Sequence, residues 1–178
     1  MLRLIHREFE VDVSLETAWK HLAQVERWPS WAKHIRRVEL TPPGDLTLHS
    51  SGAFRLSNGI RSTFKMVEMN PPKHWRWVGP FLWMMVYYDH IFEPIHNQHT
   101  RLIPVVDAEG FAVSIFGRLY AMIYNRNLNQ AIPNLIAELN TNGLLSCRSR
   151  LSKTEYARSG TAVIDGSGVT HLKFRVVK

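Results

Sequence analysis

Six segments with the pattern of β-strands follow one another between residues 35 and 106, and a short turn sequence separates each from the next. The segments are residues 35–40, 52–57, 60–69, 74–78, 82–93 and 100–106. Turns as short as NG at 58–59 or GP at 79–80 join strands that run antiparallel. The run therefore predicts one antiparallel sheet, in which Pro104 places the last strand at an edge or bulged position.

Helical patterns lie on both sides of this run. Residues 5–13 alternate as a further strand, and Ser14 is predicted to cap a helix that continues to about residue 25. A second short helical turn is expected at residues 30–35, and residues 109–140 have helical spacing. The order is strand, two short helices, six strands and one long helix, which predicts an α+β fold with the helices on one face of the sheet.

The charge of the chain is concentrated near its C-terminal end. The 178 residues have a formal net charge of +7, but residues 1–140 hold 15 Lys and Arg against 13 Asp and Glu. Residues 141–178 hold seven against two. The body lacks the basic stripe that nucleic-acid binding needs, so no nucleic-acid partner is expected. Residues 141–178 are predicted to be a basic tail, partly disordered or folded as a small hairpin.

The sequence also indicates the compartment. Cys147 is the only cysteine, so no intrachain disulfide can form, which fits a reducing environment. No apolar region of a signal peptide is found near Met1, and the longest apolar run is 11 residues, from Val78 to Tyr88. A membrane-spanning helix needs about 20. A cytoplasmic protein is therefore expected.

Four stretches carry a resemblance to a known family. They are EFEVDVSLETAWKHLAQVERWPSWAKHIRRVEL with its W-P-x-W link, VEMNPPKHWRWVG, YYDHIFEP and LNQAIPNLIAELN. In this order they resemble the START-like superfamily, the polyketide cyclase/dehydrase and lipid transport group that includes the birch pollen allergens. The resemblance covers about residues 3–140, so residues 1–140 are predicted to be one START-like domain. His99 and Thr100 stand where the family often has Gly-Thr, which affects the expected hairpin and not the fold.

The resemblance implies a helix-grip fold. A curved antiparallel sheet of about seven strands would wrap around the long C-terminal helix, with two short helices between strands 1 and 2. A cavity between sheet and helix would bind a hydrophobic or amphipathic small molecule. Family members include lipid and quinone carriers, hormone receptors, aromatic polyketide cyclases and chaperone activators, so the fold alone does not choose among these functions.

Strand alternation predicts which side chains face that cavity. Alternate residues of a strand share a face, and the apolar set on the long strand is the even-numbered one. The predicted wall from the sheet is Phe64, Trp75, Trp77, Met84, Val86, Tyr88, His90 and Phe92. A pocket for a small ligand has this composition, but so does an ordinary core, and both interpretations remain open.

The long helix has two unlike faces before residue 125. Extending its apolar stripe (Leu128, Ile132, Leu135, Leu139) backwards reaches small residues, which would leave room for a ligand: Gly110, Ser114, Gly117 and Ala121. Ser114, Gly117 and Ala121, together with Tyr124, complete the predicted helix side of the ligand site. The opposite face then carries large apolar residues: Phe111, Ile115, Phe116, Leu119, Met122 and Ile123. Three explanations are open: the helix shifts phase near residues 125–130, the face buries against a homodimer partner or the tail, or it contacts a membrane transiently.

Trp28 and Trp31 flank Pro29 in the link between the first helix and the second strand. Connections are usually polar and exposed. The two indoles are therefore expected to cap the core or form part of the cavity rim, and a hydrophobic plug without ligand contact is the alternative.

Catalytic chemistry is sparse in the sequence. Asp89 and His90 are adjacent on a strand and point to opposite faces, so they do not form a relay. His90 and Tyr88 are weak candidates for moving protons, and His96-x-x-His99 lacks an evident third metal ligand. No nucleotide loop, nucleophile elbow or zinc spacing is present, so no metal or cofactor is expected. We expect a carrier or binding protein for a lipid, quinone or polyketide-like molecule, with a cyclase or dehydratase as the alternative and an interaction module such as a chaperone-binding protein as a third class.

Overall fold

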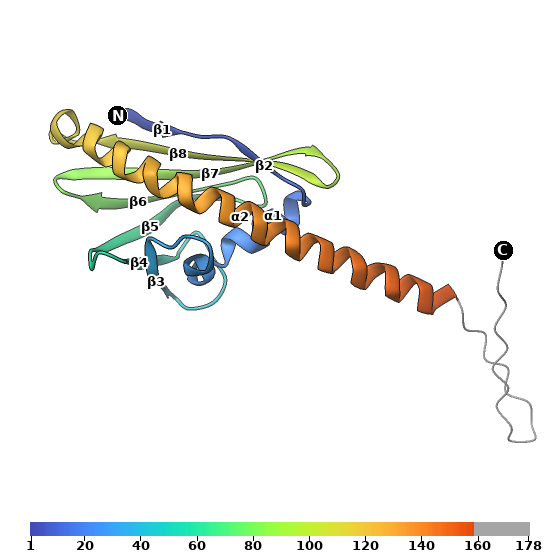
Figure 1. Ribbon diagram of the computed structural model, residues 1–178. Coiled ribbons are helices and arrows are strands. Elements are labelled where there is room, and N and C mark those ends of the chain that lie inside the picture. Colours follow the sequence, from blue (N-terminus) through green and yellow to red (C-terminus); the bar gives the residue numbers. More distant parts are fainter. Residues whose placement is uncertain (159–178) are drawn as a thin grey trace, which may run out of the picture. The chain divides into compact units, whose positions relative to one another are not determined.

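Eight β-strands form one antiparallel sheet in the computed structural model of the chain (Figure 1). The strands are β1 (Leu2–His6), β2 (Phe9–Val11), β3 (Ile35–Thr41), β4 (Ser51–Leu56), β5 (Arg61–Asn70), β6 (His74–Phe81), β7 (Met84–His96) and β8 (His99–Glu109). Their order across the sheet is β1-β8-β7-β6-β5-β4-β3, and β2 also pairs with β8. The predicted order of consecutive hairpins is confirmed, but the turn expected at residues 79–80 is wrong: Gly79 and Pro80 lie within β6, and the chain turns at Leu82 and Trp83.

Three helical segments complete the described chain: α1 (Leu15–Ala23), the 3-10 helix η1 (Val25–Ser30) and α2 (Val113–Arg158). Backbone is described for residues 1–158 and side chains for residues 1–141. Met1–Thr141 and Asn142–Lys178 are separate units, and the predicted hairpin within residues 161–176 lies outside the described residues. None of the described helices has the length and apolar content needed to cross a membrane.

The start of α1 follows the sequence prediction. Ser14 has an extended backbone, and its hydroxyl accepts a hydrogen bond from the backbone N–H of Thr17. This satisfies one of the free N–H groups of the first turn. The second helical turn was expected at residues 30–35, which is wrong: η1 comes earlier and includes Pro29. The fixed φ of proline suits a helical turn, so Pro29 continues this segment rather than interrupting it.

The first strand is split where a single one was expected. β1 and β2 both pair with β8, and they are separated at Arg7 and Glu8. Pro104 of β8 lies opposite this break, where its missing N–H would otherwise leave a gap in the ladder. Its carbonyl still accepts a hydrogen bond from the N–H of Arg7 at 3.1 Å. Pro104 is thus in an inner strand, and the break falls on the neighbouring one.

Helix α2 lies across one face of the sheet up to Thr141 (Figure 1). Two apolar clusters fill the space between them. The larger contains Trp28, Trp75, Trp77 and Phe92 with Leu135 of α2, and the smaller contains Ile5, Met84, Val86 and Val106 with Tyr120 of α2. Tyr88 packs against both clusters. A helix gripped by an antiparallel sheet is the predicted helix-grip architecture, and it is confirmed.

Candidate functional site

A cavity of about 290 Å³ lies between the sheet and α2. This volume is at the lower end of the range for small-molecule pockets. Strands β4 to β8, the segment from Trp28 to Ile35 and one face of α2 all contribute to its wall. Its aromatic lining is large: Phe9, Trp28, Trp31, Phe54, Phe64, Trp77, Phe81, Tyr88, Phe92, Tyr120 and Tyr124. The site is an apolar chamber with few polar atoms.

Trp28 fixes one end of this chamber. Its indole N–H donates a hydrogen bond of 2.8 Å to the carbonyl of Leu22, at the end of α1. Its ring lies 5.2 Å from Trp31 and 5.4 Å from Trp77, measured between ring centroids. Both Trp28 and Trp31 are buried and both line the cavity. The link therefore closes the core and forms cavity wall at the same time.

His90 lies among the aromatic rings of this wall. Its ring stacks on Trp75 at 5.0 Å and lies 4.6 Å from Trp77. Its Nδ1 is buried and has no hydrogen-bond partner among the described residues. Burial lowers the pKa of His90 from 6.5 to about 3, although the nearby Asp89 opposes the shift. The imidazole is therefore neutral at physiological pH.

Three tyrosines line the cavity beside α2. The hydroxyls of Tyr88 on β7 and Tyr120 on α2 are hydrogen-bonded, and the Tyr124 ring stacks on Tyr120 at 5.8 Å. Burial raises the pKa of Tyr88 to about 12 and raises the pKa values of Tyr120 and Tyr124 as well. All three hydroxyls keep their hydrogens at neutral pH. They are, with Asn127, polar groups that a ligand would meet on this side.

Asp89 points to the opposite face of the sheet, as strand alternation predicts. Its carboxylate accepts hydrogen bonds from Arg76, at 2.8 and 3.0 Å, and lies 2.8 Å from Nε2 of His74. Burial alone would raise the pKa of Asp89, but these bonds outweigh it and hold the pKa below its usual value. Asp89 thus belongs to an ion-pair cluster outside the cavity, and it does not relay protons to His90.

The cavity wall reaches the surface between the β4–β5 hairpin and α2. Ser57, Asn58 and Ile60 lie on the hairpin side and are exposed. Ile123 and Asn127 lie on the helix side, and Ile123 is half exposed. These residues surround the place where a ligand could enter.

The structure brings eight of the predicted ligand residues onto the cavity wall: Trp28, Trp31, Phe64, Trp77, Tyr88, His90, Phe92 and Tyr124. Trp75, Met84 and Val86 face the same side of the sheet but are fully enclosed in the two apolar clusters. The inward face was therefore predicted correctly, and the boundary between core and cavity along each strand was not.

The small residues of α2 face a different part of the sheet. Ser114, Gly117 and Ala121 line a separate groove beside Leu2 and Leu4 of β1, and none of them lines the cavity. A Cβ added at Gly117 would lie 3.2 Å from Cδ2 of Leu4. The expectation that this stripe borders the cavity is wrong, because small side chains here let α2 approach β1. Gly110 lies before the helix, with φ +115°.

Several residues of α2 that line the cavity were not predicted from the sequence. The helix runs without interruption from Val113, so the phase shift near residues 125–130 does not occur. The cavity residues of α2 are Tyr120, Ile123, Tyr124, Asn127, Leu128, Ala131, Ile132 and Leu135. Tyr120 and Tyr124 precede Leu128 at intervals of four, which was the available signal. A step of seven residues back from Leu128 reaches Ala121 instead, and this step led to the prediction of the small residues.

A family model described as polyketide cyclase / dehydrase and lipid transport matches residues 4–132. No curated protein matches the sequence of the chain.

Solved structures resemble the fold at low sequence identity. A START superfamily protein from Mycobacterium smegmatis has a TM-score of 0.60 and 14% identity, covering 77% of this chain and 97% of that one. A protein from Thermobifida fusca has a TM-score of 0.63 and 13% identity, covering 76% and 91%. The di-domain ARO/CYC BexL from the BE-7585A biosynthetic pathway has a TM-score of 0.58 and 13% identity, covering 80% and 46%.

Proposed function

Because the chain belongs to the polyketide cyclase / dehydrase and lipid transport family, we propose that it binds a hydrophobic or amphipathic small molecule as a carrier or binding protein. The ligand class is a lipid, a quinone or a polyketide-like molecule. The observation that carries this proposal is the aromatic cavity of about 290 Å³ between the sheet and α2. Its wall offers a large apolar contact surface and no ionised side chain at neutral pH.

The polar groups of the cavity suit a ligand that carries a neutral oxygen atom. Tyr88 and Tyr120 share one hydrogen bond, so one of their two hydroxyl hydrogens is left to donate elsewhere. His90 supplies a neutral imidazole on the same wall. A carbonyl or hydroxyl group satisfies donors of this kind, whereas a buried charge would find no counter-ion in the chamber.

The alternative function is a cyclase or dehydratase that uses the same cavity. It is favoured by one observation, namely that His90 and the tyrosines line one space. The lowered pKa of His90 does not favour a catalytic function, because an imidazole with a pKa of about 3 is a weak base near neutral pH. The binding role needs no proton transfer and is therefore preferred.

Native mass spectrometry of the full chain after purification tests the proposal. We expect a co-purified small molecule that is lost on denaturation. Ala131 is buried on the cavity wall, so Ala131→Leu should fill the cavity and reduce the bound fraction at least about tenfold. The matched control is Ala137→Leu, an exposed position on the same helix. Equal ligand occupancy in the two variants would contradict binding in this cavity.

The enzyme alternative is separated by the fate of the ligand. A binding protein returns the molecule unchanged after incubation, whereas an enzyme returns a dehydrated or cyclised product with a different mass. If a product forms and His90→Phe prevents its formation while the substrate still binds, the carrier function is replaced by the catalytic one.

A further inference from the structure

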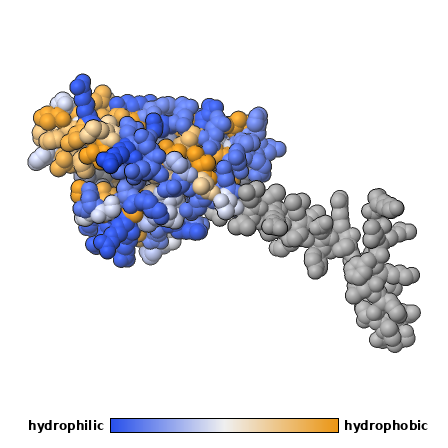
Figure 2. All heavy atoms as spheres, in the orientation of Figure 1, coloured by the Kyte–Doolittle hydropathy of each residue, from blue (hydrophilic) through white to orange (hydrophobic). Residues whose placement is uncertain are grey.

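A continuous apolar surface covers the end of the domain where α2 begins. Phe111, in the turn just before α2, is 77% exposed, and Ile115 and Met122 of α2 are 67 and 63% exposed. Leu119, also exposed, follows Ile115 one helical turn later. Figure 2 shows apolar residues gathered over this end of the molecule. Scattered exposed apolar residues are ordinary, but a cluster of this kind marks an interaction surface. We call these four residues and the turn described next the α2 apolar face.

The turn between β6 and β7 extends this face. Leu82 and Trp83 are exposed, with φ values of +41° and +47°, which large side chains rarely adopt. The ring of Trp83 lies 6.3 Å from the ring of Phe116 on α2. The turn therefore holds an exposed indole next to the helix.

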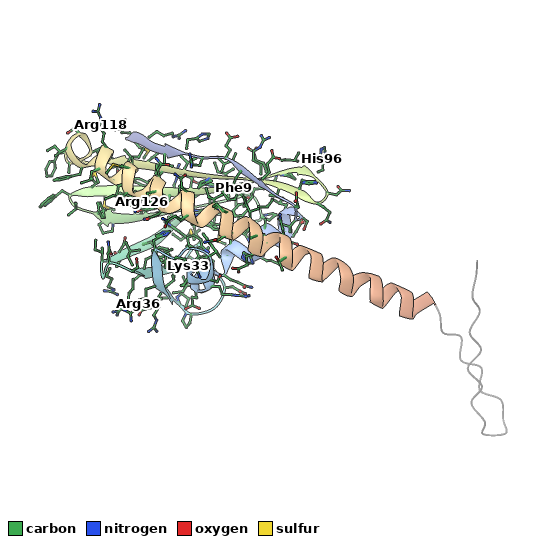
Figure 3. The ribbon with its side chains drawn as sticks, in the orientation of Figure 1. Phe9, Lys33, Arg36, His96, Arg118 and Arg126 are labelled. Carbon is green, nitrogen blue, oxygen red and sulfur yellow. The ribbon has the colours of Figure 1, made fainter. Side chains whose placement is uncertain are left out.

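The charge around this face is positive. Residues 110–137 contain no Asp or Glu. They contain two arginines, Arg118 and Arg126, and both side chains are exposed. Figure 3 shows Arg118 near the start of α2 and Arg126 further along the helix. Of the carboxylates just before the helix, Asp107 is ion-paired with Arg3 at 3.0 Å. Glu109 accepts a hydrogen bond of 2.6 Å from the neutral Tyr87 hydroxyl, which does not offset its charge, so two arginines stand against one carboxylate here.

We propose that the α2 apolar face docks on an anionic lipid bilayer, with the aliphatic side chains and Trp83 in the interfacial layer and Arg118 and Arg126 at the headgroups. Indoles favour this layer because one part is apolar and the other hydrogen-bonds. Long arginine side chains reach the headgroups while their stems stay with apolar neighbours. The described helices are not built to span the membrane, so the domain would lie on its surface.

A second copy of the chain fits this face less well. A two-fold interface places the same patch of both subunits together, so Arg118 and Arg126 of the two copies would share one interface and repel each other. A lipid surface that carries phosphates removes this repulsion. The face also borders the cavity at Ile123, which is both half exposed and part of the cavity wall. The docking proposal does not depend on what the cavity binds.

Tryptophan fluorescence of the full chain gives a specific test. Trp83 is 69% exposed, whereas Trp28, Trp31, Trp75 and Trp77 are buried and Trp19 is partly buried. Vesicles of phosphatidylcholine and phosphatidylglycerol with brominated acyl chains should quench Trp83 on binding. Trp83→Phe should still bind but lose the quenched fraction.

Matched variants test the two components of the face. Ile115→Ser should lower partitioning into these vesicles about fivefold or more, and Val67→Ser, an equivalent change at an exposed position of β5, should not. Arg118→Glu should lower it about tenfold at low ionic strength, whereas Arg36→Glu on β3 should have a smaller effect. Unchanged thermal unfolding of Ile115→Ser confirms that the loss is not one of folding.

Three results would overturn the proposal. One is vesicle binding without quenching of Trp83, which would assign the binding to the basic residues beyond 141. Another is equal partitioning of Ile115→Ser and Val67→Ser. The third is absence of vesicle binding together with a dimer in sedimentation that Ile115→Ser dissociates, which would assign the face to a second copy.

Discussion

The hydroxyl oxygens of Tyr88 on β7 and Tyr120 on α2 lie 2.6 Å apart, so one hydrogen bond joins the sheet to the helix at the cavity wall. Burial keeps both groups protonated, because it raises the pKa of Tyr88 to about 12 and the pKa of Tyr120 well above its ordinary value. Two hydroxyls bring two hydrogens, and only one can lie between the two oxygens. The pair therefore both fastens α2 and keeps one donor for a ligand.

Removing one hydroxyl of this pair leaves the other without its partner. We expect Tyr120→Phe to lower the free energy of unfolding by about 1–2 kcal/mol, the cost of an unsatisfied buried polar group. Tyr88→Phe combined with Tyr120→Phe should cost less than the sum of the two single changes. Urea denaturation of the four proteins measures this coupling. Strict additivity would show that the two hydroxyls act independently.

The neutral state of His90 makes stability depend on pH. The unfolded chain takes up a proton at this residue below about pH 6.5, whereas the folded chain resists it until about pH 3. The stabilisation is complete above pH 6.5 and is lost as the pH falls towards 3. When the pH is lowered from 7 to 5, the free energy of unfolding of the wild type should therefore fall by about 2 kcal/mol more than that of His90→Phe.

Denaturation curves at the two pH values test this difference. Burial also lowers the pKa values of His21 and His34, but both proteins contain these residues, so their contribution cancels. An identical pH dependence of wild type and His90→Phe would mean that folding does not lower the pKa of His90.

The cluster around Asp89 should respond to acid in a different range. Its pKa is held low by Arg76 and His74, so its stabilisation is present above the ordinary pKa of about 3.8 and is lost as the pH falls below it. Asp89→Asn should lower the free energy of unfolding by about 2–4 kcal/mol at pH 7, because it leaves the partly buried guanidinium of Arg76 without its carboxylate. Glu93→Gln, which neutralises an exposed acid on the same strand, is the control and should change it by less than about 0.5 kcal/mol. Equal effects of the two changes would contradict a structural role of the cluster.

Strand alternation carried most of the prediction of the sheet. The even-numbered residues of β7 from Met84 to Phe92 do face α2, because the period of two is a property of the backbone and tolerates small errors in strand ends. The same rule separated His90 from Asp89. It does not say where core ends and cavity begins, since that depends on how closely α2 approaches each strand. Trp75 and Trp77 share one face, yet only Trp77 lines the cavity.

The sequence pattern could not predict which strands the first half of α2 contacts. Positions that share a face of a helix can contact different strands, because the partner depends on how the sheet curves beneath the helix. Gly117 and Leu128 share a similar direction on α2, but Gly117 meets β1 and Leu128 meets the cavity. The split of the first strand into β1 and β2 could not be predicted for a similar reason. Pro104 lies opposite the break at Arg7 and Glu8, but it is far from these residues in the sequence.

Gly117 provides a test of this arrangement. If the small residues of α2 bordered the cavity, Gly117→Leu would abolish ligand uptake. The structure instead places Gly117 beside Leu4 of β1, at a groove that is separate from the cavity. We expect Gly117→Leu to retain the co-purified ligand and to cost up to about 1–3 kcal/mol of stability through crowding against β1.

Gly117→Ala is the milder form of the same change. Its methyl group would meet the flexible end of Leu4 at 3.2 Å and Cγ1 of Val113 at 3.4 Å, and a gain in helix propensity of up to about 1 kcal/mol offsets these contacts. Its stability should therefore stay close to that of the wild type. Native mass spectrometry and urea denaturation of the two Gly117 variants, beside Ala131→Leu, separate the two arrangements. Loss of ligand in Gly117→Leu at unchanged stability would place the small residues at the cavity after all, whereas loss in Ala131→Leu alone supports the wall described for α2.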